Sequence, residues 1–217
     1  MSDAPAPPEA VNAAQDAAAF QALTGASDAQ MADLERFREM LEAGNAVMNL
    51  VGPATLPDFW NRHAWDSAQL LRLAPSARTW ADLGAGAGFP GLVLAILFKD
   101  VPGATVHLVE SMAKRCRFLT SVSDALALPV VIHNMRAEDL SMTVDIVTAR
   151  ACAPMSRLLG YARPYLKRGA TGLFLKGQDV VSELEDATTS WKFSSRLIES
   201  LSDPRGRIVE VKGLSRA

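Results

Sequence analysis

The run Asp82-Leu83-Gly84-Ala85-Gly86-Ala87-Gly88 is the part of the sequence best suited to bind a small molecule. It begins at the end of a short apolar run at 79–83 and precedes Pro90, a residue that fits the first turn of a helix. Glycines let the backbone turn sharply and let a ligand approach it closely. A helix that follows would offer free N–H groups to an electronegative ligand atom. We therefore expect cofactor-binding residues at Asp82, Gly84, Gly86 and Gly88.

The acid at the start of this run decides between two kinds of cofactor. Segment 86–91 also matches the G-x-G-x-x-G pattern of dinucleotide-binding folds. A pyrophosphate site, however, has its first glycine at the strand end, where this chain has Asp82, and a carboxylate there would repel phosphate. The carboxylate suits a cofactor with an amino group and a sulfonium, both cationic. The alternative is a purely structural turn with a helix cap.

A second acid, Glu110, ends the next apolar run at 105–110. It lies about one strand–helix–strand unit beyond the glycine turn, where Rossmann-like folds place a carboxylate against ribose hydroxyls. We therefore expect Glu110 to bind a ribose. The alternative is a solvated glutamate at a strand end.

Apolar runs and helical stretches alternate after Pro75, which predicts a mostly parallel sheet with helices on both faces. The predicted strands are 79–83, 105–110, 130–133, 144–148 and 171–175. The predicted helices between them are 90–99, 112–126, 154–163 and 179–190. Two further candidate strands, 193–200 and 207–212, would form a terminal hairpin and add an antiparallel edge. The fold class is therefore α/β and Rossmann-like.

The segment before the sheet is predicted to be helical. We divide the chain into a disordered leader at 1–10, a helical extension at 11–75 and a sheet domain at 76–217. Within the extension, one helix would close at Gly44, and a second would run from about 57 to 73. One face of the second helix carries Phe59, His63, Asp66 and Leu70.

Length and composition limit the class of protein. A chain of 217 residues with 49% hydrophobic content suits one globular domain with a full core. We expect no membrane span and no secretory signal, because no long uncharged apolar run is present. Cys116 and Cys152 are too few and too unpatterned for a disulfide framework or a zinc cluster. We expect no metal site, and a cytoplasmic protein.

The charge is distributed unevenly along the chain. The formal net charge is −2, but residues 1–49 hold eight acidic and two basic residues, a balance of −6. Residues 50–217 hold 16 acidic and 20 basic residues, a balance of +4. The larger part is therefore mildly basic, which permits an RNA partner without requiring one.

Further segments form an ordered series with the glycine turn, and together they resemble the RsmG family, also called glucose-inhibited division protein B. The segments are Asn49-Leu50, His63-x-x-Asp66-Ser67, Glu110-Ser111-x-x-Lys114-Arg115, Arg136-Ala137-Glu138, Ala149-Arg150-Ala151 and Lys176-Gly177. The resemblance covers residue 45 to the C-terminus. It implies an S-adenosylmethionine-dependent methyltransferase that modifies guanine N7 in bacterial 16S ribosomal RNA.

The same resemblance implies further site residues. The family holds its cofactor against the glycine turn, here Gly84 and Phe89, and uses its R-A-E segment, here Ala137 and Glu138, near the adenine. It also uses the arginine that is Arg150 in this chain. The expected partner is 16S ribosomal RNA or the small ribosomal subunit, and the expected state is a monomer.

The chemistry of methyl transfer agrees with a guanine N7 acceptor. The chain has no Asn/Asp-Pro-Pro-aromatic run, which accompanies attack by an exocyclic amine. Cys152 lacks the Pro-Cys context of pyrimidine carbon methylation, and we interpret it as a buried small residue. Guanine N7 has no proton to lose, so no general base is required, and alignment alone can lower a barrier by roughly 7–11 kcal/mol. Arg150 is then the candidate for positioning substrate or cofactor.

Several basic residues could contact RNA phosphates or guanine O6. The candidates are Lys114, Arg115, Arg117, Arg157 and Lys176. The alternative for these residues is that they form a solvated basic surface and do not bind RNA. Arg150 could instead form a structural pair with Asp145 or Glu138. For His63, a capped or core-facing role is favoured over a catalytic one.

Other functions remain open at this point. Methylation of another RNA or another base would use the same cofactor residues. An NAD(P)-dependent oxidoreductase is disfavoured by Asp82 and by the lack of a Tyr-x-x-x-Lys pair. A non-catalytic RNA-binding module is disfavoured because the cofactor residues are present.

Overall fold

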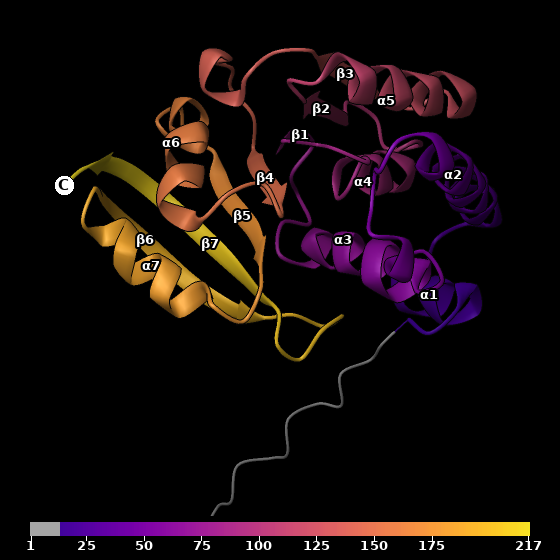
Figure 1. The fold of residues 1–217 in the computed structure, drawn as a ribbon, viewed down its shortest axis with the longest axis horizontal. Coiled ribbons are helices and arrows are strands. Elements are labelled where there is room, and N and C mark those ends of the chain that lie inside the picture. Colours follow the sequence, from indigo (N-terminus) through magenta and orange to yellow (C-terminus); the bar gives the residue numbers. More distant parts are fainter. Residues whose placement is uncertain (1–13) are drawn as a thin grey trace, which may run out of the picture.

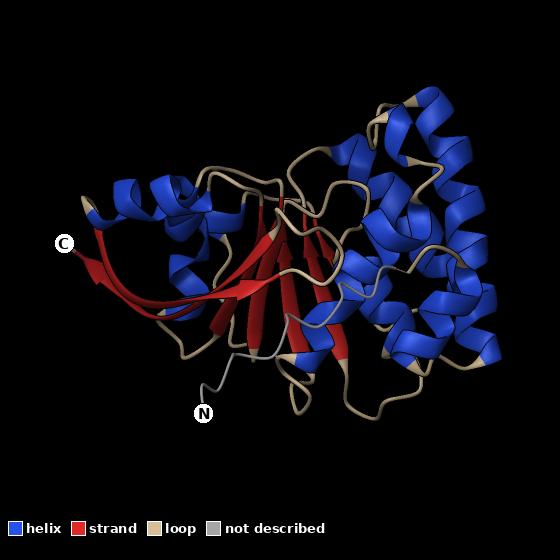
Figure 2. Cartoon of the chain, turned by 90° about the horizontal axis from the view of Figure 1, so that it is seen from below, coloured by secondary structure: helices blue, strands red, loops and turns tan. Residues whose placement is uncertain are grey.

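A seven-stranded sheet lies between two groups of helices (Figures 1 and 2). The computed structural model describes residues 14–217, so the leader predicted at 1–10 lies outside the described residues. The strands are β1 (Thr79–Leu83), β2 (Thr105–Val109), β3 (Val130–His133), β4 (Ile146–Arg150), β5 (Thr171–Lys176), β6 (Trp191–Glu199) and β7 (Arg207–Arg216). All seven strands were predicted, with small differences in bounds.

The helices connect and cover these strands. They are α1 (Ala17–Thr24), α2 (Asp28–Val47), α3 (Asp66–Ala68), α4 (Gly91–Leu97), α5 (Ala113–Leu126), α6 (Met155–Leu166) and α7 (Val180–Thr188). A π-helix, η2 (Phe59–Trp65), and three 3₁₀ helices, η1 (Pro53–Thr55), η3 (Gln69–Arg72) and η4 (Ala137–Asp139), are also present. Among residues 14–217, no helix has the length and apolar character needed to cross a bilayer.

The order of the strands is β3-β2-β1-β4-β5-β7-β6. The first five are parallel, and β7 is antiparallel to both β5 and β6. The predicted mostly parallel Rossmann-like sheet with an antiparallel edge is therefore confirmed. The chain order reverses between β1 and β4, and ligands of such sheets bind at the carboxyl ends of the strands at this point.

Alternate residues of the central strands face two separate apolar cores. Trp80 and Leu175 belong to the core formed with α1, α2, α4 and α5. Ala81 and Phe174 belong to the core formed with α6 and α7. Figure 1 shows these two groups of helices on opposite sides of the strands. Because residues of α1 and α2 share the first core with α4, the helical extension is packed directly onto the sheet domain. The division at residue 75 stays a prediction.

The first predicted helix is wrong in two respects. The chain forms two helices there, because Gly25 takes a left-handed conformation and Ser27 begins α2 with a reciprocal capping box with Gln30. Gly44 does not end α2, which continues to Val47. A Cβ at Gly44 would lie 3.0 Å from Phe118 of α5, so this glycine permits close packing of two helices.

The second predicted helix, 57–73, is present as a continuous helical segment of changing pitch. It begins with a π-helix at Phe59, passes through α3 and ends as a 3₁₀ turn at Arg72. Phe59, His63 and Leu70 are buried, as their shared face predicted. Arg62, His63 and Asp66 of this segment contact Arg150 at the end of β4.

Candidate cofactor and substrate site

The glycine turn after β1 has a backbone that only glycine adopts readily. Gly84, Gly86 and Gly88 have φ angles of 69°, 56° and 96°. A Cβ at Gly84 would lie 2.8 Å from the Sγ of Cys152, and one at Gly88 would lie 2.3 Å from Leu92. The turn is therefore closely packed on one side and leaves its other side open to a ligand.

Asp82 is fully buried beneath this turn. Its Oδ2 accepts a 2.9 Å hydrogen bond from the backbone N–H of Gly91, and its Oδ1 has no partner among residues 14–217. Burial raises the pKa of Asp82 to about 7. The expectation that the helix after the turn offers free N–H groups to a ligand is not met at its first two residues, Gly91 and Leu92. Gly91 donates to Asp82 and Leu92 donates to the carbonyl of Gly88, so these two N–H groups already have partners within the protein.

Glu110 connects the end of β2 to the glycine turn. Its side chain is 4% exposed. Oε2 accepts from the backbone N–H of Gly86 at 3.1 Å, and Oε1 accepts from that of Met112 at 2.8 Å. Arg115 lies 3.8 Å from the carboxylate. A carboxylate has about four lone-pair sites, so acceptor capacity remains for hydroxyl groups of a ligand.

A cavity of about 250 Å³ lies beside Glu110. Four predicted cofactor residues line it, namely Gly84, Glu110, Ala137 and Glu138. Sequence reasoning missed Met112 and Tyr161 on its wall, because Met112 stands at an unspecified position of the segment 110–115 and Tyr161 lies outside the recognised segments. Asp82 does not line this cavity, and Gly86, Phe89 and Arg150 line its larger neighbour instead.

The larger cavity has a volume of about 460 Å³. Its walls come from the helical extension, the glycine turn, the end of β4, the end of β5 and the β6–β7 loop. Gly84, Arg115 and Ala151 line both cavities, so the two spaces adjoin at the glycine turn. This arrangement can hold an elongated ligand in one space and bring its reactive atom to a second molecule in the other.

Arg150 is the last residue of β4 and reaches the larger cavity. Its Nη1 donates to the carbonyl of Arg62 at 2.9 Å and to Oδ2 of Asp66 at 3.3 Å. Its Nη2 lies 2.9 Å from Nδ1 of His63. The guanidinium stands over the ring of Phe89, 4.7 Å from the centroid. The side chain is thus fixed by polar contacts with three residues and by packing on Phe89.

The two structural partners suggested for Arg150 from sequence are wrong. Asp145 accepts hydrogen bonds from the backbone N–H groups of Arg78 and Thr79, at the start of β1. Glu138 pairs with Arg136. The actual acidic partner, Asp66, lies 84 residues from Arg150 in sequence. His63 is buried, 4% exposed, as the favoured core-facing role requires, but it also lines the larger cavity.

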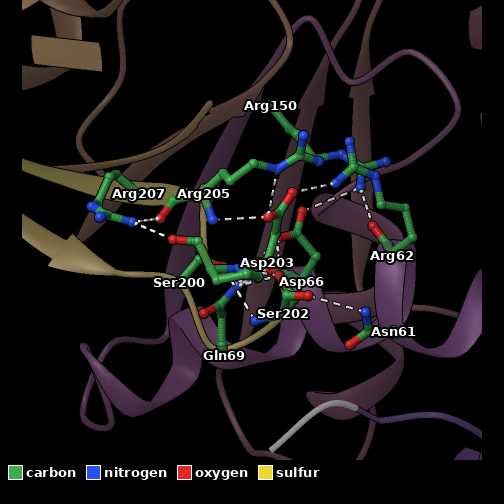
Figure 3. A network of polar contacts seen from close by, with 12 residues as sticks. Asn61, Arg62, Asp66, Gln69, Arg150, Ser200, Ser202, Asp203, Arg205 and Arg207 are labelled. Carbon is green, nitrogen blue, oxygen red and sulfur yellow. Dashed lines mark hydrogen bonds and ion pairs between the residues drawn. The ribbon is translucent and has the colours of Figure 1, made fainter. Parts of the chain in front are cut away.

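A polar network joins the extension to the β6–β7 loop, residues 200–206 (Figure 3). Oδ1 of Asp66 accepts from the hydroxyl of Ser202 at 2.6 Å. Asp203 pairs with Arg62 at 3.0 Å, and Asn61 donates to the carbonyl of Ser202. Sequence reasoning missed this loop. Ser202 is 136 residues away from Asp66 along the chain, and nothing in the composition of the loop indicates that the two side chains are in contact.

The five basic candidates differ in how far their charge is already paired. Lys114, Arg117 and Arg157 are exposed. Arg115 lies near Glu110, as described above. Lys176 pairs with Glu183 at 2.6 Å and donates to the carbonyl of Ala153 at 3.0 Å, so its ammonium group has two internal partners. A role in RNA contact stays a prediction for all five.

Cys152 lines the smaller cavity and is partly buried rather than buried. Burial, with the nearby charges of Asp82 and Glu110, raises the pKa of its thiol to about 11. The thiol is therefore neutral near pH 7, whereas a thiol nucleophile reacts as the thiolate.

Comparison with known proteins decides the family. Residues 30–213 match the family described as rRNA small subunit methyltransferase G. The chain belongs to this family. The resemblance stated from residue 45 onward is thereby confirmed, and the match also includes most of α2.

Relatives and a solved structure agree with this membership in the rRNA small subunit methyltransferase G family. A protein of this name from Caulobacter sp. (strain K31) is 73% identical over 199 residues, 92% of this chain and 90% of the relative. One from Caulobacter vibrioides is 66% identical over 209 residues, 96% of this chain and 95% of the relative. A crystal structure of a SAM-dependent methyltransferase from Aquifex aeolicus has a TM-score of 0.54 at 18% identity. It covers 77% of this chain and 97% of its own, and supports the fold alone.

Proposed function

We propose that this chain transfers a methyl group from S-adenosylmethionine to N7 of a guanine in the 16S ribosomal RNA of the small ribosomal subunit. The observation that carries the proposal is the pair of adjoining cavities, which meet at Gly84. The smaller cavity offers carboxylates, and the larger contains a fixed arginine and further cations. We propose that the protein acts as a monomer in the cytoplasm.

The residues of the smaller cavity fit S-adenosylmethionine. Asp82 lines neither cavity but lies buried beneath the glycine turn, and its carboxylate, when ionised, would attract a cationic cofactor that lies against this turn. Glu110 would accept from the ribose hydroxyls, and Ala137 with Glu138 would lie against the adenine. The glycine turn would let the cofactor lie close to the backbone at Gly84. The bound cofactor supplies a methyl group that is already activated for displacement.

The larger cavity lacks a suitable general base among the described residues that line it. Its acids are Asp66 and Asp203, and both are paired with arginines. Burial and the charges of Arg150 and Arg62 lower the pKa of His63 to about 3, and both of its ring nitrogens have partners. Guanine N7 carries a lone pair and no proton, so its attack requires alignment rather than proton removal. This favours N7 over an exocyclic amine as the acceptor.

The charge of the larger cavity favours an anionic partner such as RNA. Its lining includes the basic residues Arg62, Arg115, Arg150, Lys176 and Arg207. Basic side chains bind RNA chiefly through the phosphates, and this contribution falls as salt concentration rises. We propose that the exposed Lys114, Arg117 and Arg157 extend this contact beyond the cavity.

The decisive experiment maps N7-methylguanine in 16S ribosomal RNA from a strain that lacks this chain, with and without the gene restored. We expect one guanine to lose the modification in the deletion strain and to regain it on restoration. Purified small-subunit particles from the deletion strain should accept labelled methyl groups from S-adenosylmethionine in vitro. Methylation of another base, or an unchanged 16S pattern, would disprove the proposal.

A further inference from the structure

We propose that His63 is a positioning residue, which fixes the guanidinium of Arg150 so that its remaining donors point into the larger cavity. This inference rests on the proposed function, because it assigns a task to Arg150 in the methyl-transfer site. His63 does not itself touch the reacting groups in this proposal. It acts through Arg150.

The positions of two protons determine how His63 interacts with Arg150. The hydroxyl of Thr55 donates to the carbonyl of Gly52 at 2.8 Å, so its oxygen must accept in its 2.9 Å contact with Nε2 of His63. Nε2 therefore carries the imidazole proton, and Nδ1 has a free lone pair. Arginine has only donors, and Nη2 of Arg150 lies 2.9 Å from this Nδ1. The chain Gly52–Thr55–His63–Arg150 thus has one consistent direction of donation.

The surroundings keep the imidazole in this form. His63 is 4% exposed, and its ring stacks on Phe89 with centroids 4.7 Å apart and planes at 21°. The guanidinium of Arg150 stands over the same Phe89 ring. The imidazole of His63 and the guanidinium of Arg150 therefore both pack on the ring of Phe89, which helps to fix their positions. The low pKa of His63 agrees with a neutral acceptor near pH 7.

The remaining contacts of Arg150 leave part of its fork free. Nη1 uses the carbonyl of Arg62 and Oδ2 of Asp66, and Nη2 uses Nδ1 of His63. Nε has no hydrogen-bond partner within residues 14–217, and one N–H of Nη2 is also left. Those donors are available to an electronegative group of the cofactor or of guanine, since a guanidinium has five donors in a fixed plane.

A neutral partner also preserves the positive charge of Arg150. Its carboxylate partner, Asp66, is shared, because Oδ1 of Asp66 accepts from Ser202 and Gln69 while Oδ2 lies 3.3 Å from Arg150. A second acid at position 63 would pair with the guanidinium and reduce its attraction for an anionic ligand. An imidazole that accepts a hydrogen bond orients the group without neutralising it.

Two substitutions at position 63 separate orientation from packing. His63→Phe keeps a buried aromatic ring against Phe89 but removes the acceptor. His63→Asn places an amide oxygen near the position of Nδ1 and restores the acceptor while reducing the packing. We expect His63→Phe to lower kcat for methyl transfer to small-subunit particles at least tenfold, with a smaller change in KM. We expect His63→Asn to recover a large part of this loss despite a lower melting temperature. An active His63→Phe protein, or His63→Asn no better than it, would overturn the proposal.

A double-mutant cycle tests whether His63 acts through Arg150. In an Arg150→Ala background, His63→Phe should cause less than a twofold further loss of kcat. Losses that multiply independently would overturn the proposal. Thr55→Val provides a milder variant should His63→Phe unfold. It removes the group that fixes the tautomer, and its loss of kcat should also vanish in the Arg150→Ala background.

A measurement without substrate keeps this inference distinct from the proposed function. The side-chain NMR signals of Arg150, assigned by their absence in Arg150→Lys, should report a guanidinium with restricted rotation in the original chain. His63→Phe should increase that rotation, and His63→Asn should restrict it again. If methyl transfer to 16S ribosomal RNA is absent while these signals respond as stated, the proposed function fails and the positioning geometry stands. Signals that do not respond would overturn the inference.

Discussion

The carboxylate of Glu110 accepts a 3.1 Å hydrogen bond from the backbone N–H of Gly86, so the end of β2 fixes the turn that follows β1. The same carboxylate accepts from Met112 and stands on the wall of the smaller cavity. One side chain therefore both shapes the glycine turn and is placed to bind a ligand.

Replacement of Glu110 tests its role in cofactor binding. Glu110→Ala should weaken S-adenosylmethionine binding by about 1–3 kcal/mol, because donors of the turn and the ligand lose their acceptor. Titration calorimetry measures this change, with the exposed Glu199→Ala as a control of similar chemistry. Unchanged affinity in Glu110→Ala would show that another residue binds the ribose.

Gly84 should tolerate no side chain. Gly84→Ala would place a Cβ 2.8 Å from the Sγ of Cys152 at a strained φ of 69°, so the turn or the side chain of Cys152 must shift where both cavities meet. We expect S-adenosylmethionine binding to fall below detection by calorimetry. Gly103→Ala is a matched control, because Gly103 has a φ of 75° with no atom within 4 Å of the added Cβ. Normal binding by Gly84→Ala would contradict the assigned cofactor position.

Arg150→Ala should lower methyl transfer to small-subunit particles at least about tenfold, equivalent to about 1.4 kcal/mol in the transition state. Arg150→Lys should rescue poorly, because an ammonium group cannot replace a planar fork that contacts Asp66 and His63 together. Thermal melting of both variants separates this effect from unfolding. A fully active Arg150→Ala enzyme would show that Arg150 has no role in methyl transfer.

Asp82 should make cofactor affinity depend on pH. Its pKa of about 7 means that the free protein carries a neutral carboxyl below pH 7, and a cationic cofactor favours the ionised form. Affinity for S-adenosylmethionine should therefore rise about tenfold from pH 6 to pH 7.5, with proton release on binding below pH 7. Asp82→Asn corrects for titration of the ligand itself and should show a smaller change. Equal pH dependence in both proteins would contradict a role for Asp82.

Cys152→Ser should keep most methyl transfer. The thiol has a pKa of about 11 and is neutral near pH 7, and attack by guanine N7 needs no covalent adduct with the enzyme. Initial rates with small-subunit particles measure this directly. Loss of all activity in a folded Cys152→Ser protein would instead indicate methylation at a pyrimidine carbon.

Local patterns were sufficient to predict the sheet and four of the residues that line the smaller cavity. The glycine turn, Glu110 and the segment from Ala137 to Glu138 each follow a strand or its connection, so strand order alone brings them to one edge. The surroundings of Arg150 could not be predicted in this way. Its partners His63 and Asp66 lie 87 and 84 residues away, and their shared helical face gave only a packing role. The packing of Gly44 against α5 and the place of β7 between β5 and β6 also depend on tertiary contacts.

The contacts of Asp66 have a consequence for the order of folding. Its carboxylate contacts Arg150 and Ser202, which lie 84 and 136 residues away along the chain. Closing such long loops costs conformational entropy, so contacts of this range form late, after local helices and neighbouring strands. The wall that the β6–β7 loop adds to the larger cavity is therefore among the last features to assemble. Local opening of the β6–β7 loop would remove this wall while the parallel strands remain paired. The protein would then lose activity under conditions in which its sheet is still folded.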